Sequence, residues 1–447
     1  MAIKKLSPVA LATRDFYLRQ ADELIAKESS DTLKTIRNAA KLMFKEQAFP
    51  TQKDEHWQYT RLAQFVQKSF DSLQTAHVPN IDLHAYMPDF AVVKVVFVDG
   101  WFSETLSDDL SVLPAGVSLE PMTDTLSDST GVAHVFNNEE TILQEPMATM
   151  NSMLMTDGYY LQVSQNKAVE TPLLVLHLQT QSGHMSALRN KVVVGENAEV
   201  TLLERYVSLV DDDSACTNVV TEIDVAKNAL VKQVILQQQF HDAYYFNNQF
   251  ITQAENSNFQ TLFASSGSWI ARHQNHLKMD GEHIENSQNS ACVAKGKQTV
   301  DSRSFTEHNQ EWGVSRQLHK YVLDDQSIGV FDGMIRVDRK AQKTDGQMDN
   351  KNLVLSHQAK MNTKPQLEIY ADDVACSHGS ATGQIDEKQV FYLQARGISR
   401  TDAVQMITKA FLLEPVEDIA SNEIRQWITK EMTTALNATH IAQAHLG

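Results

Sequence analysis

The spacing of hydrophobic residues predicts two helices at the start of the chain. Between residues 8 and 48 apolar side chains recur at mostly three- and four-residue steps, the spacing of a helix with one buried face. The first set comprises Ala10, Leu11, Phe16, Leu18, Ala21, Leu24 and Ile25. Ser30 and Asp31 are residue types that begin helices, so we expect a second helix there, which ends before Pro50.

From about residue 90 the pattern changes to short runs rich in Val, Ile and Leu, separated by turn-forming residues. Such runs occupy residues 92–100, 171–180, 190–209 and 230–240. Because no helical pattern of ten or more residues interrupts 190–323, a fold of alternating strands and helices is disfavoured. The spacing leaves a β-sandwich and a parallel β-helix both open. Polar runs at Gln237–Gln239 and Asn247–Asn248 weakly favour the β-helix.

After Gly383 the helical pattern returns. Asp386 is placed to begin one helix, Gly397 to follow its end, and Ser399 to begin a second through a capping box with Asp402. A last helix is expected from about residue 421 towards 438. We therefore expect an N-terminal helical region at 1–85, a β core at 86–380 and a C-terminal helical domain at 381–447.

Charge and cysteine content limit the classes of function. The 447 residues include 39 Lys and Arg and 56 Asp and Glu, a net charge of −17, which argues against broad binding to nucleic acid or anionic membranes. No signal peptide or membrane-spanning run is apparent, so a cytoplasmic protein is expected. The three cysteines, Cys216, Cys292 and Cys376, are far apart. They indicate a reducing compartment and are too few for a four-thiolate iron–sulfur cluster within this chain.

Several possible sites are better explained as ordinary structure. Gly296-Lys297-Gln298 lacks the first glycine and the hydroxyl residue of a phosphate-binding loop, and we expect no catalytic site in this chain. His273 and His276 should point to opposite faces of a strand, and with His283 they are expected to be polar strand and turn residues. Asp211–Asp213 and Asp324-Asp325 are typical of solvated turns. Residues 53–60 are expected to form a surface loop anchored by Trp57 and Tyr59.

The sharpest local pattern is Cys376-Ser377-His378. Residues i and i+2 of a strand share a face, so the thiol and the imidazole should lie side by side. A neighbouring imidazolium favours the thiolate, and sulfur and imidazole both suit iron. A Cys-x-His pair alone is weak support for a metal site, and a structural cysteine is the ordinary alternative.

The longer context of this pair resembles a known family. The matching runs are Glu55-His-Trp57, Glu307-His-Asn309, Ser315–Leu318, Lys343–Asp345, Asn352–Leu355, Thr363–Val374, Cys376–Gly379, Gly383–Asp386 and Phe391–Gly397. These runs resemble the SufB/SufD family of iron–sulfur cluster assembly subunits over nearly the whole chain. Gly379 after His378, and the absence of a second cysteine nearby, resemble the SufD branch more than the SufB branch.

The resemblance implies a right-handed parallel β-helix between two helical regions. It implies a complex with SufB, joined through the last β-helix strands, and with two copies of the ABC-type ATPase SufC, docked on the C-terminal helices. A transient iron–sulfur cluster would form at the SufB interface, with His378 as ligand and Cys376 in support. The resemblance also allows reduced flavin at the level of the complex, a role in iron acquisition, and a homodimer when SufB is absent.

Two other functions stay open at this point. A polysaccharide-acting β-helix enzyme predicts Asp, Lys and Arg clustered in one groove. A purely structural solenoid that recruits the ATPase without binding metal predicts that Cys376 and His378 are dispensable.

Overall fold

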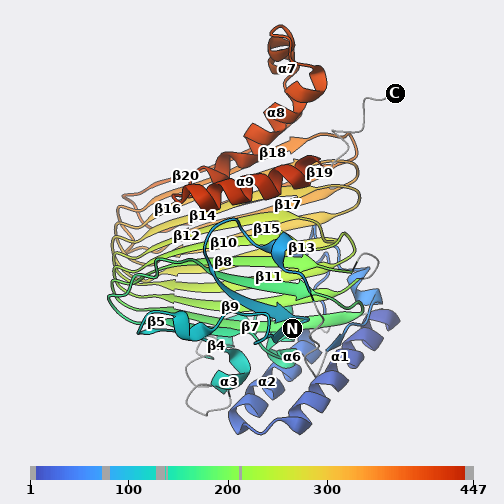
Figure 1. The fold of residues 1–447 in the computed structure, drawn as a ribbon, viewed down its shortest axis with the longest axis vertical. Coiled ribbons are helices and arrows are strands. Elements are labelled where there is room, and N and C mark those ends of the chain that lie inside the picture. Colours follow the sequence, from blue (N-terminus) through green and yellow to red (C-terminus); the bar gives the residue numbers. More distant parts are fainter. Residues whose placement is uncertain (1–6, 73–80, 127–135, 137–138, 211–213, 438–447) are drawn as a thin grey trace.

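Two facing sheets form the body of the protein, and the chain passes alternately between them. The computed structural model describes residues 7–72, 81–126, 136, 139–210 and 214–437. Within this part of the chain each sheet has ten strands, and nearly all neighbouring strands are parallel (Figure 1). The stack is a β-solenoid of about eight turns with helices at both termini. The mainly β class and the parallel solenoid are therefore confirmed, and the sandwich alternative is wrong.

The strands of the first sheet, called sheet A here, are β4 (Val117–Pro121), β5 (Tyr159–Val163), β7 (His184–Val194), β9 (Cys216–Val225), β11 (Tyr244–Gln253), β13 (Ile270–Met279), β15 (Thr299–His308), β17 (Ile328–Val337) and β19 (Lys360–Ile369), in this spatial order, with β1 (Asp71–Ser72) beside β7. Sheet B contains β3 (Trp101–Phe102), β2 (Val93–Val98), β6 (Leu173–Gln179), β8 (Glu199–Ser208), β10 (Leu230–Gln238), β12 (Asn258–Ser266), β14 (Glu285–Ala294), β16 (Val314–Leu323), β18 (Asp345–Val354) and β20 (Ala375–Gly383). Among the strands that the structure describes, only the pairs β2–β3 and β4–β5 are antiparallel.

The helices of the N-terminal region and the early β body are α1 (Pro8–Lys27), α2 (Asp31–Gln47), η1 (Glu55–Trp57), η2 (Phe65–Gln67), η3 (His84–Tyr86), η4 (Leu110–Val112), α3 (Met122–Leu126), α5 (Glu139–Ile142) and α6 (Pro146–Leu154). Those after the solenoid are α7 (Glu387–Gln394), α8 (Arg400–Leu413), η5 (Glu414–Val416) and α9 (Asn422–Asn437). Ser30, Asp386 and Ser399 cap α2, α7 and α8 as the sequence predicts.

One corner of the solenoid is marked by residues in the left-handed backbone conformation. They recur every 27–31 residues, namely Asn166, Asn197, Asn228, Asn256, His283, Trp312 and Lys343. Asparagine tolerates this conformation better than most residues. The side-chain amide of Asn197 donates to Asn166, and that of Asn228 donates to Asn197, each at 2.8 Å. The spacing of these corner residues gives the length of one solenoid turn. Because the residue types differ from turn to turn, the repeat is not visible as sequence identity.

Side chains of each strand point alternately into and out of the solenoid. The inward side chains form one continuous apolar core from Val95 to Ala371. Polar residues enter this core in the middle turns, where the Gln237 amide donates to Ser268 and accepts from Ser265, at 2.8 and 2.7 Å. Hydrogen bonds of this kind offset the cost of burying amides. Gln237 and Gln239 of the glutamine run are therefore buried, whereas Gln238 points outward and donates to Glu431 of α9.

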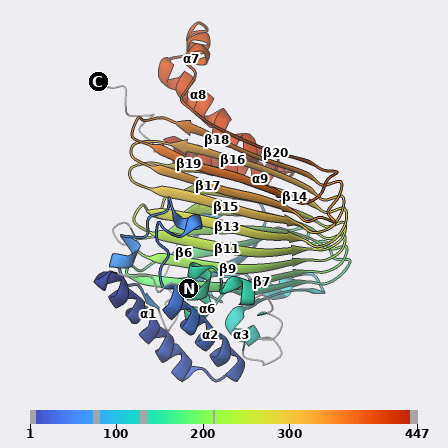
Figure 2. The same cartoon turned by 180° about the vertical axis from the view of Figure 1, so that it is seen from behind.

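The two helical regions cover the outer faces of different sheets. The N-terminal helices pack Tyr17, Phe44 and Phe65 against sheet A near its first turns, together with Tyr244 and Phe246 (Figure 2). Helices α8 and α9 pack on sheet B with another apolar cluster. Among the described residues, no helix is both long enough and apolar enough to span a bilayer.

Candidate functional site

The last turn of the solenoid, β19 and β20, is exposed at its open end. No described strand pairs with the far edge of either strand, so β19 and β20 each have one strand neighbour. No residue of β20 is classed as buried, whereas every residue of β6 near the other end is. Unpaired edges of this length are templates for another strand. The open end is therefore the part of the solenoid best suited to receive a partner.

Cys376 and His378 lie on β20 and share its inward side. In the register, Cys376 is level with Gly346 and His378 with Met348 of β18. Met348 is 1% exposed and belongs to the interior core, so side chains in these columns point towards the interior of the solenoid. Cys376 packs partly against that core, while His378 is exposed because no further turn covers it. The structure therefore places the two predicted side chains together on the open end.

The facing strand β19 completes this surface. Met361 and Leu367 are partly buried against the core from the β19 side. The hydroxyl oxygens of Thr363 and Ser380 lie 3.0 Å apart and join β19 to β20. The open end thus combines apolar side chains with a thiol, an imidazole and hydroxyls, and all of them would be buried by a partner placed on the last turn.

The environment of Cys376 keeps its thiol protonated. Burial raises the pKa of Cys376, the nearby Asp345 carboxylate raises it too, and a backbone hydrogen bond involving Gly346 acts in the opposite direction. The expectation that a neighbouring imidazolium makes Cys376 a thiolate is therefore wrong for this chain by itself. The fully buried Cys216 and Cys292 have raised pKa values for the same reason, burial. None of the three thiols has the depressed pKa of a reactive cysteine.

The open end offers two metal donors in this chain. Among the described residues, no group of three or more His, Cys, Asp or Glu side chains is arranged to hold a metal ion. An iron–sulfur cluster commonly takes four protein ligands. A cluster bound at Cys376 and His378 would therefore need the remaining ligands from elsewhere.

The other sequence candidates do not form sites. His273 points inward and stacks on Phe263, His276 stacks on Phe250 at the outer face, and His283 stacks on Trp312 at a corner. Burial lowers the pKa of His273 to about 3. Gly296 and Asp325 are corner residues with positive φ. Asp211–Asp213 lie outside the described residues.

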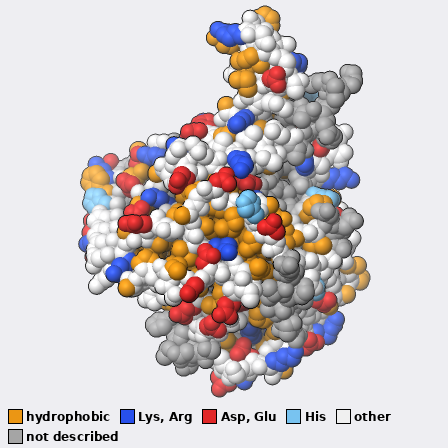
Figure 3. All heavy atoms as spheres, viewed as in Figure 1, with side chains coloured by type: hydrophobic (Ala, Val, Ile, Leu, Met, Phe, Trp, Pro, Cys, Tyr) orange, Lys and Arg blue, Asp and Glu red, His pale blue; other side chains and the backbone are white. Residues whose placement is uncertain are grey.

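Helices α7 and α8 form a hairpin that projects beyond the solenoid (Figure 1). Phe391, Tyr392 and Met406 are 72%, 57% and 51% exposed on it, and orange side chains are visible at its tip in Figure 3. Its base is fixed to sheet B, where the buried Lys320 of β16 pairs with Glu414 and lies 4.2 Å from the Phe411 ring. An apolar tip on a fixed base is typical of a docking element.

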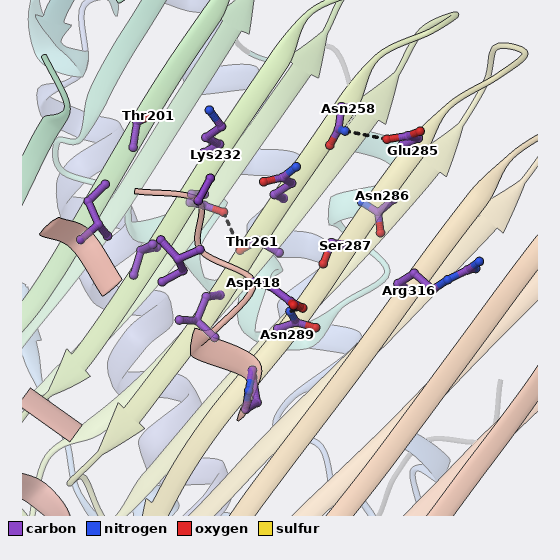
Figure 4. Close-up of a pocket in the computed structure, with 18 of the residues that line it drawn as sticks. Thr201, Lys232, Asn258, Thr261, Glu285, Asn286, Ser287, Asn289, Arg316 and Asp418 are labelled. Carbon is purple, nitrogen blue, oxygen red and sulfur yellow. Dashed lines mark hydrogen bonds between the residues drawn. The ribbon is translucent and has the colours of Figure 1, made fainter. Parts of the chain in front are cut away.

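A groove of about 480 Å³ lies between the outer face of sheet B and the segment that leads into α9 (Figure 4). Its floor includes Lys232, Ser287 and Arg316, and its wall includes Asp418 and Ile424. Lys232 pairs with Glu199 at 2.7 Å and Arg316 pairs with Asp345. These two cations are thus paired with carboxylates on neighbouring strands of sheet B.

Sequence reasoning missed the ion pairs that join neighbouring turns. Arg272 of β13 pairs with Asp301 of β15, and both are almost completely buried on the outer face of sheet A. Arg336 of β17 likewise donates to Glu307 of β15 at 2.9 Å. The two residues of each pair are 29 positions apart in the sequence, which is about one turn of the solenoid. Opposite charges at the repeat length are the signal that identifies such pairs.

Comparisons with known proteins give the family. The family profile described as "SUF system FeS cluster assembly, SufBD core domain" matches residues 177–411, and that of the "SufBD protein N-terminal region" matches residues 13–175. The iron–sulfur cluster assembly protein SufD of Escherichia coli is 33% identical, over 85% of this chain and 87% of its own. A SufBD family protein of Synechocystis is 30% identical, over 83% and 84%. Protein ABCI7, chloroplastic, of Arabidopsis thaliana is 28% identical, over 90% and 86%.

The protein is thus a parallel β-solenoid with a two-donor open end, and both halves of its sequence match one family. The chain belongs to the SufB/SufD family of iron–sulfur cluster assembly proteins.

Proposed function

We propose that this chain is a non-catalytic scaffold subunit on which an iron–sulfur cluster is assembled at the interface with a SufB-type paralogue. The observation that carries the proposal is the placement of Cys376 and His378 side by side on the exposed inward face of β20. The nascent cluster is cargo in this scheme. His378 supplies a neutral imidazole to iron, and Cys376 supports it once its thiol is deprotonated by metal.

The exposed edges of the last turn support a paired solenoid as the partner. A second solenoid with a similar open end would add strands to β19 and β20, continue both sheets and bury Met361 and Leu367. The partner would then supply the ligands that this chain lacks. A second copy of this chain would fit the same edges when the paralogue is absent.

The projecting hairpin supports an ATPase as the third component. Phe391 and Tyr392 on α7 provide an apolar tip, and Glu414 joins the base to Lys320 of β16. Strands β16, β18 and β20 are consecutive neighbours in sheet B. A SufC-type ATPase docked on the hairpin is therefore connected by one sheet to the strand that carries His378.

The test replaces the two donors in cells that depend on this assembly system alone. His378→Ala should lower the maturation of iron–sulfur enzymes by about 10–100-fold, because a ligand is lost, while the complex still assembles. Cys376→Ser should be milder, because its protonated thiol is the supporting donor. His357→Ala is the matched control, since His357 is an exposed histidine on the turn between β18 and β19.

Two outcomes would contradict this proposal. Normal maturation with His378→Ala would remove the ligand role and favour the purely structural solenoid. A stronger effect from Cys376→Ser than from His378→Ala would reverse the two roles. Co-purification of a SufB-type paralogue and an ABC-type ATPase with the wild-type chain tests the complex independently.

A further inference from the structure

The segment Glu55–Thr60 lies across the outer face of sheet A, against strands that come much later in the sequence. It follows α2, and its residues contact four consecutive strands of the sheet, β13, β15, β17 and β19. We call this segment the clasp. The contacted residues are 216, 241, 276 and 309 positions further along the chain than the clasp residues that they bind.

The inner half of the clasp is buried on β13 and β15. Trp57 is 2% exposed, and the Arg272 guanidinium lies 3.9 Å from the centroid of its ring. Arg272 donates to the backbone carbonyl of His56 at 2.8 Å and pairs with Asp301. The Thr60 hydroxyl donates to the same carboxylate of Asp301. Of the two anchors expected from the sequence, Trp57 is confirmed, whereas Tyr59 is 39% exposed and the buried Thr60 takes its place.

The outer half of the clasp reaches the last two strands of the sheet. His56 Nδ1 lies 2.8 Å from Asp332 Oδ2 on β17, and Asp332 is also 3.4 Å from the Arg303 guanidinium. Glu55 pairs with Lys364 on β19, and the register places Lys364 directly beside Asp332. The basic His56 and Lys364 therefore face the acidic Asp332 and Glu55 across the last two strands of sheet A.

Strand β19 needs such a contact because it is hydrogen-bonded to a strand on one side only. It is joined in turn to β20 through the Thr363–Ser380 pair, and Met361 and Leu367 lie against the same core as Cys376. We propose that Glu55 and His56 are positioning residues that hold β19, and through it the strand carrying Cys376 and His378, in place at the open end. The importance of that end for cluster assembly rests on the proposed function, while the positioning itself does not.

The three cysteines provide a built-in readout for this proposal. Cys216 and Cys292 are 0% exposed, and Cys376 is the partly exposed one. Alkylation of the folded chain therefore reports on β20. Hydrogen exchange of residues 360–383 gives a second readout, because opening of a strand exposes its amides.

The experiment uses the purified full chain with Glu55→Gln and His56→Ala combined. We expect the rate of Cys376 alkylation and the amide exchange of β19 and β20 to rise about two- to fivefold, with the melting temperature nearly unchanged, because Trp57 and Thr60 still anchor the segment. Lys364→Gln should reproduce the Glu55 part of the effect from the strand side. Adding Glu55→Gln to Lys364→Gln should then change little.

The matched control is Lys227→Gln. Lys227 pairs with Glu255 at 2.8 Å, both side chains are 45–46% exposed, and the pair lies at a corner of the inner turns. An unchanged Cys376 rate in the double variant, or an equal rise in Lys227→Gln, would overturn the positioning role. This outcome can be distinguished from failure of the proposed function. If the proposed function were wrong, His378→Ala would leave cluster formation intact, whatever effect the clasp variants have on the alkylation of Cys376.

Discussion

The two ends of the solenoid are built in opposite ways. At the first end the sheets finish in the short antiparallel strands β3 and β4, and helices α1, α2 and α6 pack over sheet A. At the last end β19 and β20 finish without a following strand, and β20 is exposed along its length. The first end is closed by the chain itself, so stability should be concentrated there. The last end is left for a partner.

The closed end also contains a buried ion cluster. Arg189 of β7 is 0% exposed and pairs with Glu139 of α5 at 2.5 Å and with Glu222 of β9 at 2.7 Å. Ser152 of α6 accepts another hydrogen bond from the same guanidinium at 3.2 Å. This cluster joins helices α5 and α6 to two neighbouring turns. The Glu55–Lys364 pair on the last strand of sheet A, by contrast, is partly exposed.

The largest effect on stability is expected from Arg189→Met. Removing the cation leaves the buried Glu222 with Lys191, 3.7 Å away, as its positive partner, so the loss should reach at most the about 3–5 kcal/mol typical of a broken buried pair. The measurement is the free energy of unfolding in urea. Arg316→Met is the control, because its pair with Asp345 is 41% and 36% exposed and should contribute about 1 kcal/mol or less. Equal losses for the two variants would contradict the contrast between the ends.

An intermediate effect is expected from acid, through histidines buried as neutral rings. Burial lowers the pKa of His177, His273 and His319 to about 3, and that of His308 to about 4. Above pH 6.5 these rings are neutral in the folded and unfolded chain, so their contribution is complete. As the pH falls from about 6.5 towards 3, the unfolded chain takes up protons that the folded chain does not, and stability is lost.

The variant His177→Phe measures how much of this acid-induced loss of stability is due to a single buried histidine. His177 stacks between Tyr206 and Phe97, and neither of its ring nitrogens is hydrogen-bonded to a described residue, so a phenyl ring suits the site. Between pH 7 and pH 5 the drop in unfolding free energy should shrink by about 2 kcal/mol relative to wild type. His241→Phe, at an exposed corner, should leave the drop unchanged. An unaltered pH dependence in His177→Phe would show that the ring is protonated in the folded chain.

The smallest effect on stability is expected at the open end, from Phe391→Ser combined with Tyr392→Ser. Both side chains are mostly exposed on α7, so the free energy of unfolding should change by about 0.5 kcal/mol or less. Binding of the proposed ATPase partner should nevertheless be lost, which a pull-down from cells that express this chain and a SufC-type ATPase would detect. Leu42→Ser, an exposed apolar residue of α2, is the control. Retained binding in the α7 variant would remove the hairpin as the docking element.

The local features of the fold were predictable from the sequence. Ser30, Asp386 and Ser399 begin helices because their side chains accept from backbone N–H groups two or three residues later, which depends on near neighbours alone. The shared face of Cys376 and His378 follows in the same way from the two-residue period of a strand. The choice of a solenoid over a sandwich came from family resemblance, since the hydrophobic pattern suits both.

The non-local features were not predictable. The raised pKa of Cys376 depends on burial and on Asp345, which lies 31 positions earlier and is brought close by the register. The cluster around Arg189 joins residues from Glu139 to Glu222, and the clasp joins Glu55 to Lys364. Nothing in the spacing of such residues distinguishes partners from other charges until the turn length is known.

The clasp also has a consequence for biosynthesis. Its partner Lys364 is 309 residues downstream of Glu55, so ribosomes that add about 5–20 residues each second need roughly 15–60 s to supply it. Until then Trp57 has no complete surface to cover, and the edges of β19 and β20 do not exist. A chain that ends before Lys364 therefore lacks both the outer clasp contact and the two edge strands that we propose receive a partner.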